Sequence, residues 1–105
     1  MNESHFKTLR ELSTEGTITQ RELSRRLGLS LGSINYIIRA LMEKGYIKAQ
    51  RFKNSNNKLG YIYILTPEGM KQKLKQTKIF MKRKLEEYEQ LKLEIKILKN
   101  GNTQR

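Results

Sequence analysis

Small and polar side chains gather within residues 30–39, and their types suit hydrogen bonding to nucleic acid. Hydroxyl and amide groups can bond to base edges, arginine can contact phosphate, and glycine lets a backbone approach a groove closely. The pattern therefore points to non-covalent recognition of double-stranded DNA. The residues concerned are Ser30, Gly32, Ser33, Asn35, Tyr36 and Arg39.

Two predicted helices position these side chains. A short helix over residues 20–27 ends at Gly28, and a second helix spans 31–44. In the second, apolar residues recur at spacings of three and four, which predicts one buried face: Ile34, Ile37, Ile38, Leu41 and Met42. The opposite face then presents Gly32, Ser33, Tyr36, Arg39 and Glu43, with Asn35 on its flank. A short helix, a turn with glycine and a second helix form the helix-turn-helix layout.

Capping signals support both helices. Thr19 and Glu22 have the spacing of a capping box. Ser30 is placed to cap the second helix, and Gly45 to end it in the left-handed region. A capped helix N-terminus brings free amides and a positive dipole end towards phosphate. Three cations lie elsewhere on the short helix, and we expect at least one to contact phosphate, the alternative being a solvated face: Arg21, Arg25 and Arg26.

Composition narrows the possible functions. The 105 residues include 22 Lys and Arg against 10 Asp and Glu, a formal charge of +12. So large a positive charge favours a polyanionic partner, whereas solubility alone needs far less. The chain has no cysteine and only one histidine, His5, which we expect to be solvated. We therefore expect no catalytic residues, metal site or cofactor. Neither a signal peptide nor a membrane span is predicted, which favours a cytoplasmic protein.

The remaining segments predict a winged fold, mainly α with a small β-hairpin (α+β). A first helix is expected over residues 3–13 with Ser4 as its cap, then a turn at Glu15-Gly16 and an extended Thr17-Ile18. Strands are expected over 46–52 and 61–66. The polar loop between them, residues 53–60, reads as a wing, or alternatively as a mobile loop. As a wing, Lys53 and Lys58 could contact phosphate, and Lys58 or Arg51 of the first strand could enter a minor groove.

A long helix ends the chain. Thr66 and Pro67 give its start, Gly69 is a mild defect in its first turn, and Asn100-Gly101 is expected to stop it. We expect a domain over 3–69, a helix over 70–99 and a disordered tail over 100–105. Apolar heptads favour a homodimer over a helix folded back on its own domain, with parallel and antiparallel pairing both open. The predicted dimer residues are Met81, Leu85, Tyr88, Leu91, Ile95 and Leu98.

In sequence, the chain resembles the MarR-type transcriptional regulators. The shared motifs are LSLGSINYIIRALMEKGYIKAQRF over 29–52 and YIYILTPEGM over 61–70. They contain a serine-initiated helix, the exit Leu-x-x-Lys-Gly-Tyr-Ile into a strand, and Leu-Thr-Pro-x-Gly at the last helix. The wing KNSNNKLGY and the tail KRKLEEYEQLKLEI are similar to a small subgroup associated with bacterial exopolysaccharide gene clusters.

The resemblance implies a transcription regulator whose second helix enters the major groove of DNA. Carried over by position, it assigns base contacts to the residues from Ser30 to Tyr36 named above, with Arg39 nearer the backbone. Family members have an acidic residue and an arginine in the wing, where this chain has Asn57 and Leu59, so Lys58 is the expected substitute. Family members dimerise through helices at both ends of the chain and hold a small-ligand pocket between them. This chain has a short first helix and a single long last one, so we expect neither the usual dimer nor a small-molecule effector.

Two other functions compete with DNA binding. Winged helices also serve as docking modules for proteins, and the tail could bind another helix. An enzyme is the weakest alternative, because the sequence holds no convergent set of catalytic groups.

Overall fold

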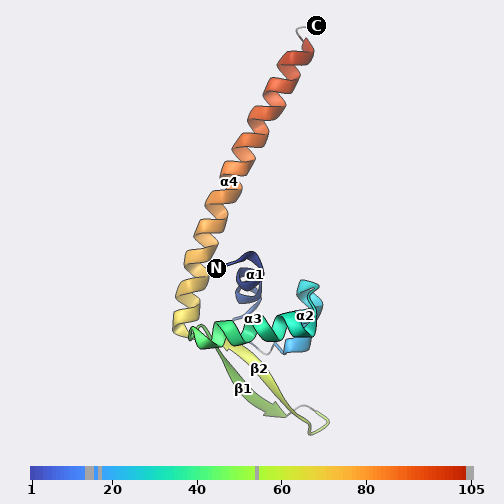
Figure 1. Cartoon of the computed structure of the whole chain (residues 1–105), viewed down its shortest axis with the longest axis vertical. Coiled ribbons are helices and arrows are strands. Elements are labelled where there is room, and N and C mark those ends of the chain that lie inside the picture. The colour runs from blue at the N-terminus through green and yellow to red at the C-terminus, as the bar shows by residue number, and fades with distance from the viewer. Residues whose placement is uncertain (14–15, 17, 54, 104–105) are drawn as a thin grey trace. The chain divides into compact units, whose positions relative to one another are not determined.

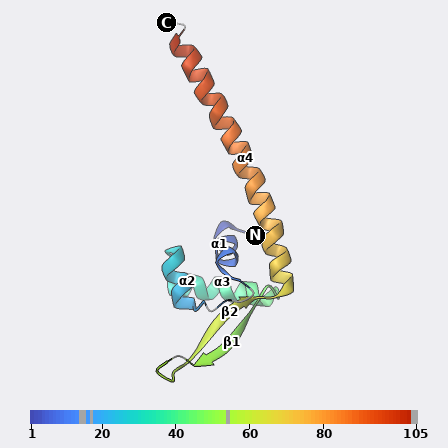
Figure 2. The same cartoon turned by 180° about the vertical axis from the view of Figure 1, so that it is seen from behind.

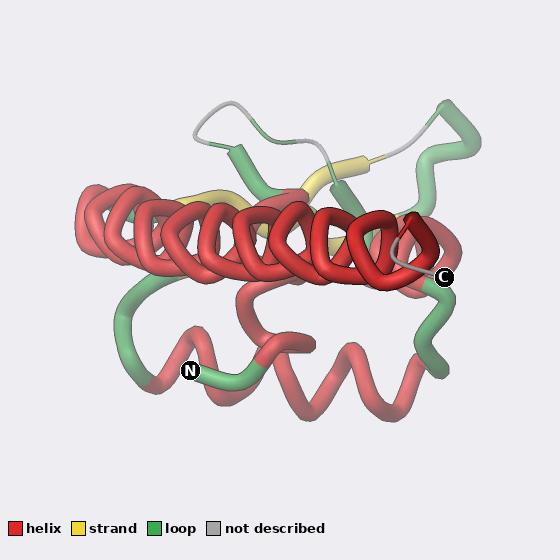
Figure 3. The backbone as a smooth tube through the Cα atoms, turned by 90° about the horizontal axis from the view of Figure 1, so that it is seen from above, coloured by secondary structure: helices red, strands yellow, loops and turns green. Residues whose placement is uncertain are grey.

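A computed structural model describes residues 1–13, 16, 18–53 and 55–103. The elements in order are α1 (Glu3–Glu11), α2 (Gln20–Leu27), α3 (Leu31–Glu43), β1 (Ile47–Lys53), β2 (Leu59–Leu65) and α4 (Pro67–Thr103) (Figure 1). Figure 3 shows helix as the main element of the backbone. The predicted class, mainly α with a β-hairpin in a winged helix-turn-helix followed by a long helix, is confirmed.

The chain divides into two compact units, Met1–Leu74 and Lys75–Arg105. The first two turns of α4 belong to the first unit, and the rest of α4 forms the second. The predicted stop at Asn100-Gly101 is wrong, because α4 continues through both residues to Thr103. Only residues 104 and 105 of the predicted tail lie outside the described residues.

Helix α1 begins at Glu3 as predicted, but it has a different cap and ends two residues earlier. Its cap is Asn2, whose Oδ1 accepts a hydrogen bond from the His5 amide at 2.8 Å. Ser4, the predicted cap, lies inside the helix, where its carbonyl accepts from the Thr8 hydroxyl. Leu12 is already extended, so the helix ends before residue 13. Glu15 of the predicted turn and Thr17 of the predicted extended segment lie outside the described residues.

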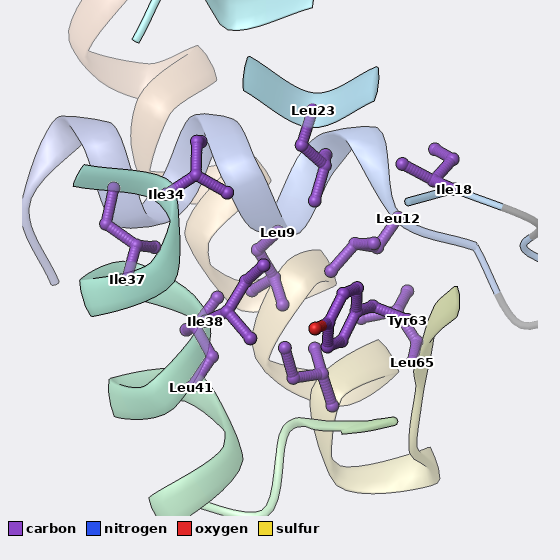
Figure 4. Packing of buried hydrophobic residues seen from close by; sticks show 11 residues of the cluster. Leu9, Leu12, Ile18, Leu23, Ile34, Ile37, Ile38, Leu41, Tyr63 and Leu65 are labelled. Atoms are coloured by element: carbon purple, nitrogen blue, oxygen red, sulfur yellow. The ribbon is translucent and has the colours of Figure 1, made fainter. Parts of the chain in front are cut away.

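One apolar cluster holds the first unit together (Figure 4). It joins three helices to the hairpin: Leu9, Leu12, Ile18, Leu23, Ile34, Ile37, Ile38, Leu41, Ile47, Tyr63 and Leu65. Helix α3 contributes four of these residues, so its predicted buried stripe is confirmed except at Met42, which is 41% exposed. Met42 lies about a quarter-turn from the centre of the stripe and therefore reaches the surface.

The hairpin β1–β2 is antiparallel, with Ile47 opposite Leu65 and Lys53 opposite Leu59. It extends from the helices as a two-stranded ribbon in both opposite views (Figures 1 and 2). The strands extend into both ends of the predicted loop 53–60, because β1 runs to Lys53 and β2 begins at Leu59. Ile18 bridges to Tyr63, whose amide donates to the Ile18 carbonyl at 3.0 Å, so Ile18 is extended as predicted.

The start of α4 is packed against the α3–β1 turn. The Thr66 hydroxyl accepts from the Gly69 amide at 3.0 Å, which confirms the predicted cap. Gly69 is buried, and a Cβ added there would lie 1.8 Å from the Tyr46 carbonyl oxygen. The description of Gly69 as a mild defect is therefore wrong: it permits a close approach between two segments of backbone.

Candidate nucleic-acid interface

The first turn of α3 is fixed by a pair of serines. Ser30 is extended and its hydroxyl accepts from the Ser33 amide at 3.1 Å, as predicted for the cap. The two hydroxyl oxygens lie 2.9 Å apart in a second hydrogen bond. Both side chains are exposed. Their oxygens retain acceptor capacity, so this turn can present hydroxyl groups to a ligand without unfolding its own cap.

The outer face of α3 is open to solvent. Gly32 is exposed, and a Cβ added to it would have only the Ser30 hydroxyl within 4 Å, at 3.9 Å. Tyr36 is 71% exposed, Ser33 and Arg39 are exposed, and Asn35 is half-buried on the flank. On the other side Ile34, Ile38 and Leu41 are almost completely buried. The structure thus brings the predicted residues of α3 together on one accessible surface, which we call the α3 face: Ser30, Gly32, Ser33, Asn35, Tyr36 and Arg39.

Two residues that the sequence analysis missed hold α2 against the start of α3. The Gln20 side-chain amide donates to the Leu31 carbonyl at 3.0 Å, and the Ser24 hydroxyl donates to the Leu29 carbonyl. Gly28, at φ +65°, turns the chain between them. Gln20 and Ser24 are four residues apart and therefore share a helix face. That spacing was a signal available in the sequence. Together these contacts set the angle at which α3 is presented.

The cations of α2 differ in their surroundings. Glu22 forms ion pairs with both Arg25 and Arg26, and the hydrogen bond from Arg25 is the main reason why the pKa of the Glu22 carboxyl is lowered. Arg26 also lies 3.6 Å from Glu11. The Thr19 half of the capping box is present, with its hydroxyl accepting from the Glu22 amide at 3.2 Å. Arg21 is exposed, and no acidic residue of the described part of the chain forms an ion pair with it.

His5 belongs to the surroundings of the α3 face, contrary to the expectation of a solvated residue. It is half-buried, its Nδ1 lies 2.5 Å from Asn2 Oδ1, and its ring meets the Tyr36 ring edge-on at 6.4 Å. Burial, with smaller effects of Lys44 and the N-terminal ammonium, lowers the pKa of His5. A hollow of about 540 Å³ opens beside these rings, lined by Asn2, Ser4, His5, Leu29, Gly32, Ser33, Tyr36 and Ile37.

The wing carries its cations on a separate element. Ile47 and Leu65 anchor the base of the hairpin in the core, while Lys53 and Lys58 are exposed towards its tip. Arg51 lies over the ring of Tyr61, 5.9 Å from its centre, and its Nε is 3.5 Å from the tyrosine hydroxyl. Tyr61, which was not among the residues predicted from the sequence, is 49% exposed and holds Arg51 along the strand. Lys53 and Lys58 therefore do not belong to the α3 face. With Arg51 they form a separate basic surface on the hairpin.

Helix α4 presents apolar side chains to solvent throughout the second unit. The predicted dimer residues are all more than half exposed in the single chain: Met81, Leu85, Tyr88, Leu91, Ile95 and Leu98. No helix within the described residues is long and apolar enough to cross a bilayer. The described residues also hold no cluster of three or more His, Cys, Asp or Glu that could bind a metal.

Comparison with known proteins identifies similar chains. A profile of the family described as "Winged helix-turn-helix DNA-binding" matches residues 1–48. The multiple antibiotic resistance protein MarR of Salmonella typhimurium is 36% identical over 66 residues, which are 63% of this chain and 44% of that relative. The chain thus spans less than half of the curated relative's length. The matching profile is thus described by DNA binding.

Two solved structures show the same similarity. A structure of the multiple antibiotic resistance repressor MarR has a TM-score of 0.67 at 25% identity, covering 79% of this chain and 59% of that one. A mutant MarR from E. coli complexed with operator DNA has a TM-score of 0.59 at 28% identity, covering 71% of this chain and 52% of that one.

Proposed function

We propose that this protein, whose winged helix-turn-helix domain is similar to that of MarR regulators, binds double-stranded DNA and regulates transcription as a member of that family. The observation that carries the proposal is the α3 face, where small and polar groups are exposed because Ile34, Ile38 and Leu41 are buried behind them. A net charge of +12 supports it, since phosphate attraction and counterion release favour binding.

In the proposed complex α3 enters the major groove from its N-terminal end. Gly32 leaves room for the backbone, and Ser33, Asn35 and Tyr36 are the groups nearest the base edges. Ser30 and the amides of the first turn face a phosphate. Arg39, Arg21 and Arg25 are assigned to the DNA backbone, Arg25 at the cost of its contact with Glu22. Lys53 and Lys58 extend these backbone contacts from the wing.

We propose that the protein acts as a homodimer through α4. Two copies would then address half-sites about 10 base pairs apart, or a multiple of that spacing, on one side of the duplex. Access to the chromosome places this function in the cytoplasm. The association with exopolysaccharide gene clusters is part of the proposal and rests on the wing and tail sequences KNSNNKLGY and KRKLEEYEQLKLEI.

A gel shift with random-sequence duplex at low and high salt tests DNA binding itself. We expect binding at low salt that weakens steeply as salt rises. Absence of binding at low salt would instead favour a protein-docking module. Selection of bound genomic fragments, followed by footprinting, then identifies the operator and the genes beside it.

Replacing Arg39 with alanine is expected to weaken binding to all sequences alike. If Arg39 contacts one phosphate, the slope of log affinity against log salt should fall by about one. Arg10 provides the control, because it is an exposed arginine that stacks on Phe6 in α1, outside the α3 face. Arg10→Ala should leave the slope nearly unchanged. Equal slopes for Arg39→Ala and the unaltered protein, with folding intact, would contradict the assignment.

The residues proposed to contact base edges are tested by measuring which DNA sequences the protein prefers. Ser33→Ala and Asn35→Ala are expected to change which sequences are bound, while the salt slope stays close to its original value. Selection from a randomised duplex library measures both properties for each variant. An unchanged preference in both variants would remove this turn of α3 from the base contacts.

A further inference from the structure

The side chains that flank the apolar seam of α4 are sorted by charge. Assigned as heptads, the seam has Leu74, Met81, Tyr88 and Ile95 at position a, and Thr77, Lys84, Leu91 and Leu98 at position d. In a two-stranded coiled coil, positions e and g lie beside this seam. Position e carries Lys71, Lys78, Leu85, Lys92 and Lys99, and position g carries Lys73, Phe80, Glu87 and Glu94.

The second unit therefore has lysine on one side of the seam and glutamate on the other. Lys92 and Lys99 occupy the e side, and Glu87 and Glu94 occupy the g side. The apolar residues between them are 53–67% exposed in the single chain: Tyr88, Leu91, Ile95 and Leu98. Packing a partner helix against this apolar face would remove it from water and stabilise it. The lysine and glutamate edges determine which charges the partner helix must carry beside the seam.

A second copy of α4 fits these edges in one orientation. In a parallel pair, position g of one helix lies next to position e of the following heptad in the other. Glu87 then meets Lys92 of the partner subunit, and Glu94 meets Lys99 of the partner subunit, each contact occurring twice by symmetry. In an antiparallel pair, e lies beside e and g beside g. That arrangement places lysine against lysine and glutamate against glutamate.

Contacts within the single chain do not oppose this pairing. Glu87 lies 3.4 Å from Lys84, and Lys92 lies 3.9 Å from Glu89, with every side chain in these pairs more than half exposed. Exposed ion pairs of this type are weak and exchange readily. At the other end of the seam, Lys73 donates to the Leu12 carbonyl at 3.0 Å within the first unit. That contact draws Lys73 away from the otherwise repulsive position opposite Lys78 of the partner subunit.

We propose that α4 pairs with a second copy of itself as a parallel, in-register coiled coil, with its orientation set by Glu87, Glu94, Lys92 and Lys99. The proposal rests on the homodimer included in the proposed function and adds its direction and its contacts. Lys84 places a polar residue at position d of the seam. Leu85, the next residue at position e, supplies an apolar side chain beside that layer. Parallel pairing brings the two α4 start points, and hence the two DNA-binding domains, to the same end of the coiled coil.

Cysteine cross-linking reads the orientation directly, because the natural chain contains no cysteine. Position d faces position d of the partner only in a parallel, in-register pair. Leu91→Cys is therefore expected to form a disulfide-linked dimer under mild oxidation. Gln90→Cys, at the exposed position c away from the seam, is the control and should cross-link poorly. If a mixture of Met81→Cys and Leu91→Cys chains links while Leu91→Cys alone does not, the pair is antiparallel and the proposal is wrong.

Charge reversal tests the contacts themselves in the full chain. Glu87→Lys with Glu94→Lys turns four attractive contacts of the parallel pair into repulsive ones, which should raise the dimer dissociation constant roughly tenfold or more at low salt. Adding Lys92→Glu and Lys99→Glu should restore it. The control pair Glu86→Lys with Glu89→Lys makes the same change of net charge off the seam and should have little effect. In an antiparallel pair all three variants would dimerise alike.

Sedimentation equilibrium measures the dissociation constants, and circular dichroism confirms that each variant keeps its helix content. A natural chain that stays monomeric at all concentrations would overturn the proposal. A gel shift on the same samples separates this inference from the proposed function. Dimers with the predicted cross-link but without DNA binding would leave the orientation standing and remove the regulatory role.

Discussion

Replacing Gly69 with alanine is expected to destabilise the first unit by about 3 kcal/mol or more, or to prevent its folding. The added Cβ would lie 1.8 Å from the Tyr46 carbonyl oxygen and 2.7 Å from its carbonyl carbon. These are backbone atoms that cannot turn aside. The Tyr46 amide donates to the Leu41 carbonyl at 3.0 Å, and the Tyr46 carbonyl accepts from the Thr66 amide at 3.0 Å. Relief of the clash would therefore break the junction between α3, β1 and α4.

The sign of this effect is opposite to the usual one. Within a helix, alanine in place of glycine ordinarily stabilises by up to about 1 kcal/mol. Gly101→Ala is the matched control, since Gly101 lies in the same helix with no atom within 4 Å of its added Cβ. Urea unfolding of both variants gives the comparison. A Gly69→Ala protein as stable as the unaltered one would show that α4 does not approach Tyr46 so closely.

Replacing Gly32 with glutamate is expected to abolish specific DNA binding while leaving the fold intact. The position is exposed and an added Cβ would have only the Ser30 hydroxyl within 4 Å, so the larger side chain fits the free protein. Glycine is also a poor helix former, so folding stability should stay the same or rise slightly. In the proposed complex the same side chain would enter the space between α3 and the groove and bring a negative charge towards phosphate. We expect affinity for an operator to fall by at least about a hundredfold, or about 2.7 kcal/mol.

Thermal unfolding and gel shifts on the same samples separate the two effects of this substitution. Gly32→Ala should give a smaller loss of affinity, because only one methyl group is added. Gly101→Glu makes an identical change of charge at an exposed helical glycine in the second unit and should bind DNA nearly as well as the unaltered protein. Undiminished affinity in Gly32→Glu would exclude the N-terminal turn of α3 from the DNA contacts.

Local patterns in the sequence were sufficient for much of the architecture. The apolar stripe of α3 determines which of its sides is buried, because helical periodicity fixes the directions of its side chains. Ser30, Thr19 and Thr66 mark helix starts for an equally local reason: each supplies a hydroxyl within reach of an amide three residues on. The exposed positions of Gly32, Ser33 and Tyr36 follow from the same periodicity.

Contacts between distant segments were not predictable in this way. Gly69 is critical only because Tyr46, 23 positions earlier, lies against it. His5 has an aromatic neighbour only because Tyr36 of another helix lies beside it. Likewise, Gln20 and Ser24 acquire their role from the carbonyls of Leu31 and Leu29. No periodicity within one element encodes such neighbours.

The sequence by itself determined the helices, the hairpin, the positive charge and the composition of the α3 face. Each of these depends on a residue's own type or on neighbours within about one helical turn. Only the tertiary structure decided the setting of α3 against α2, the contact of Arg26 with Glu11, and the close packing at Gly69. These features require atoms from separate parts of the chain to meet, and the free energy of such contacts depends on distances that sequence spacing does not contain.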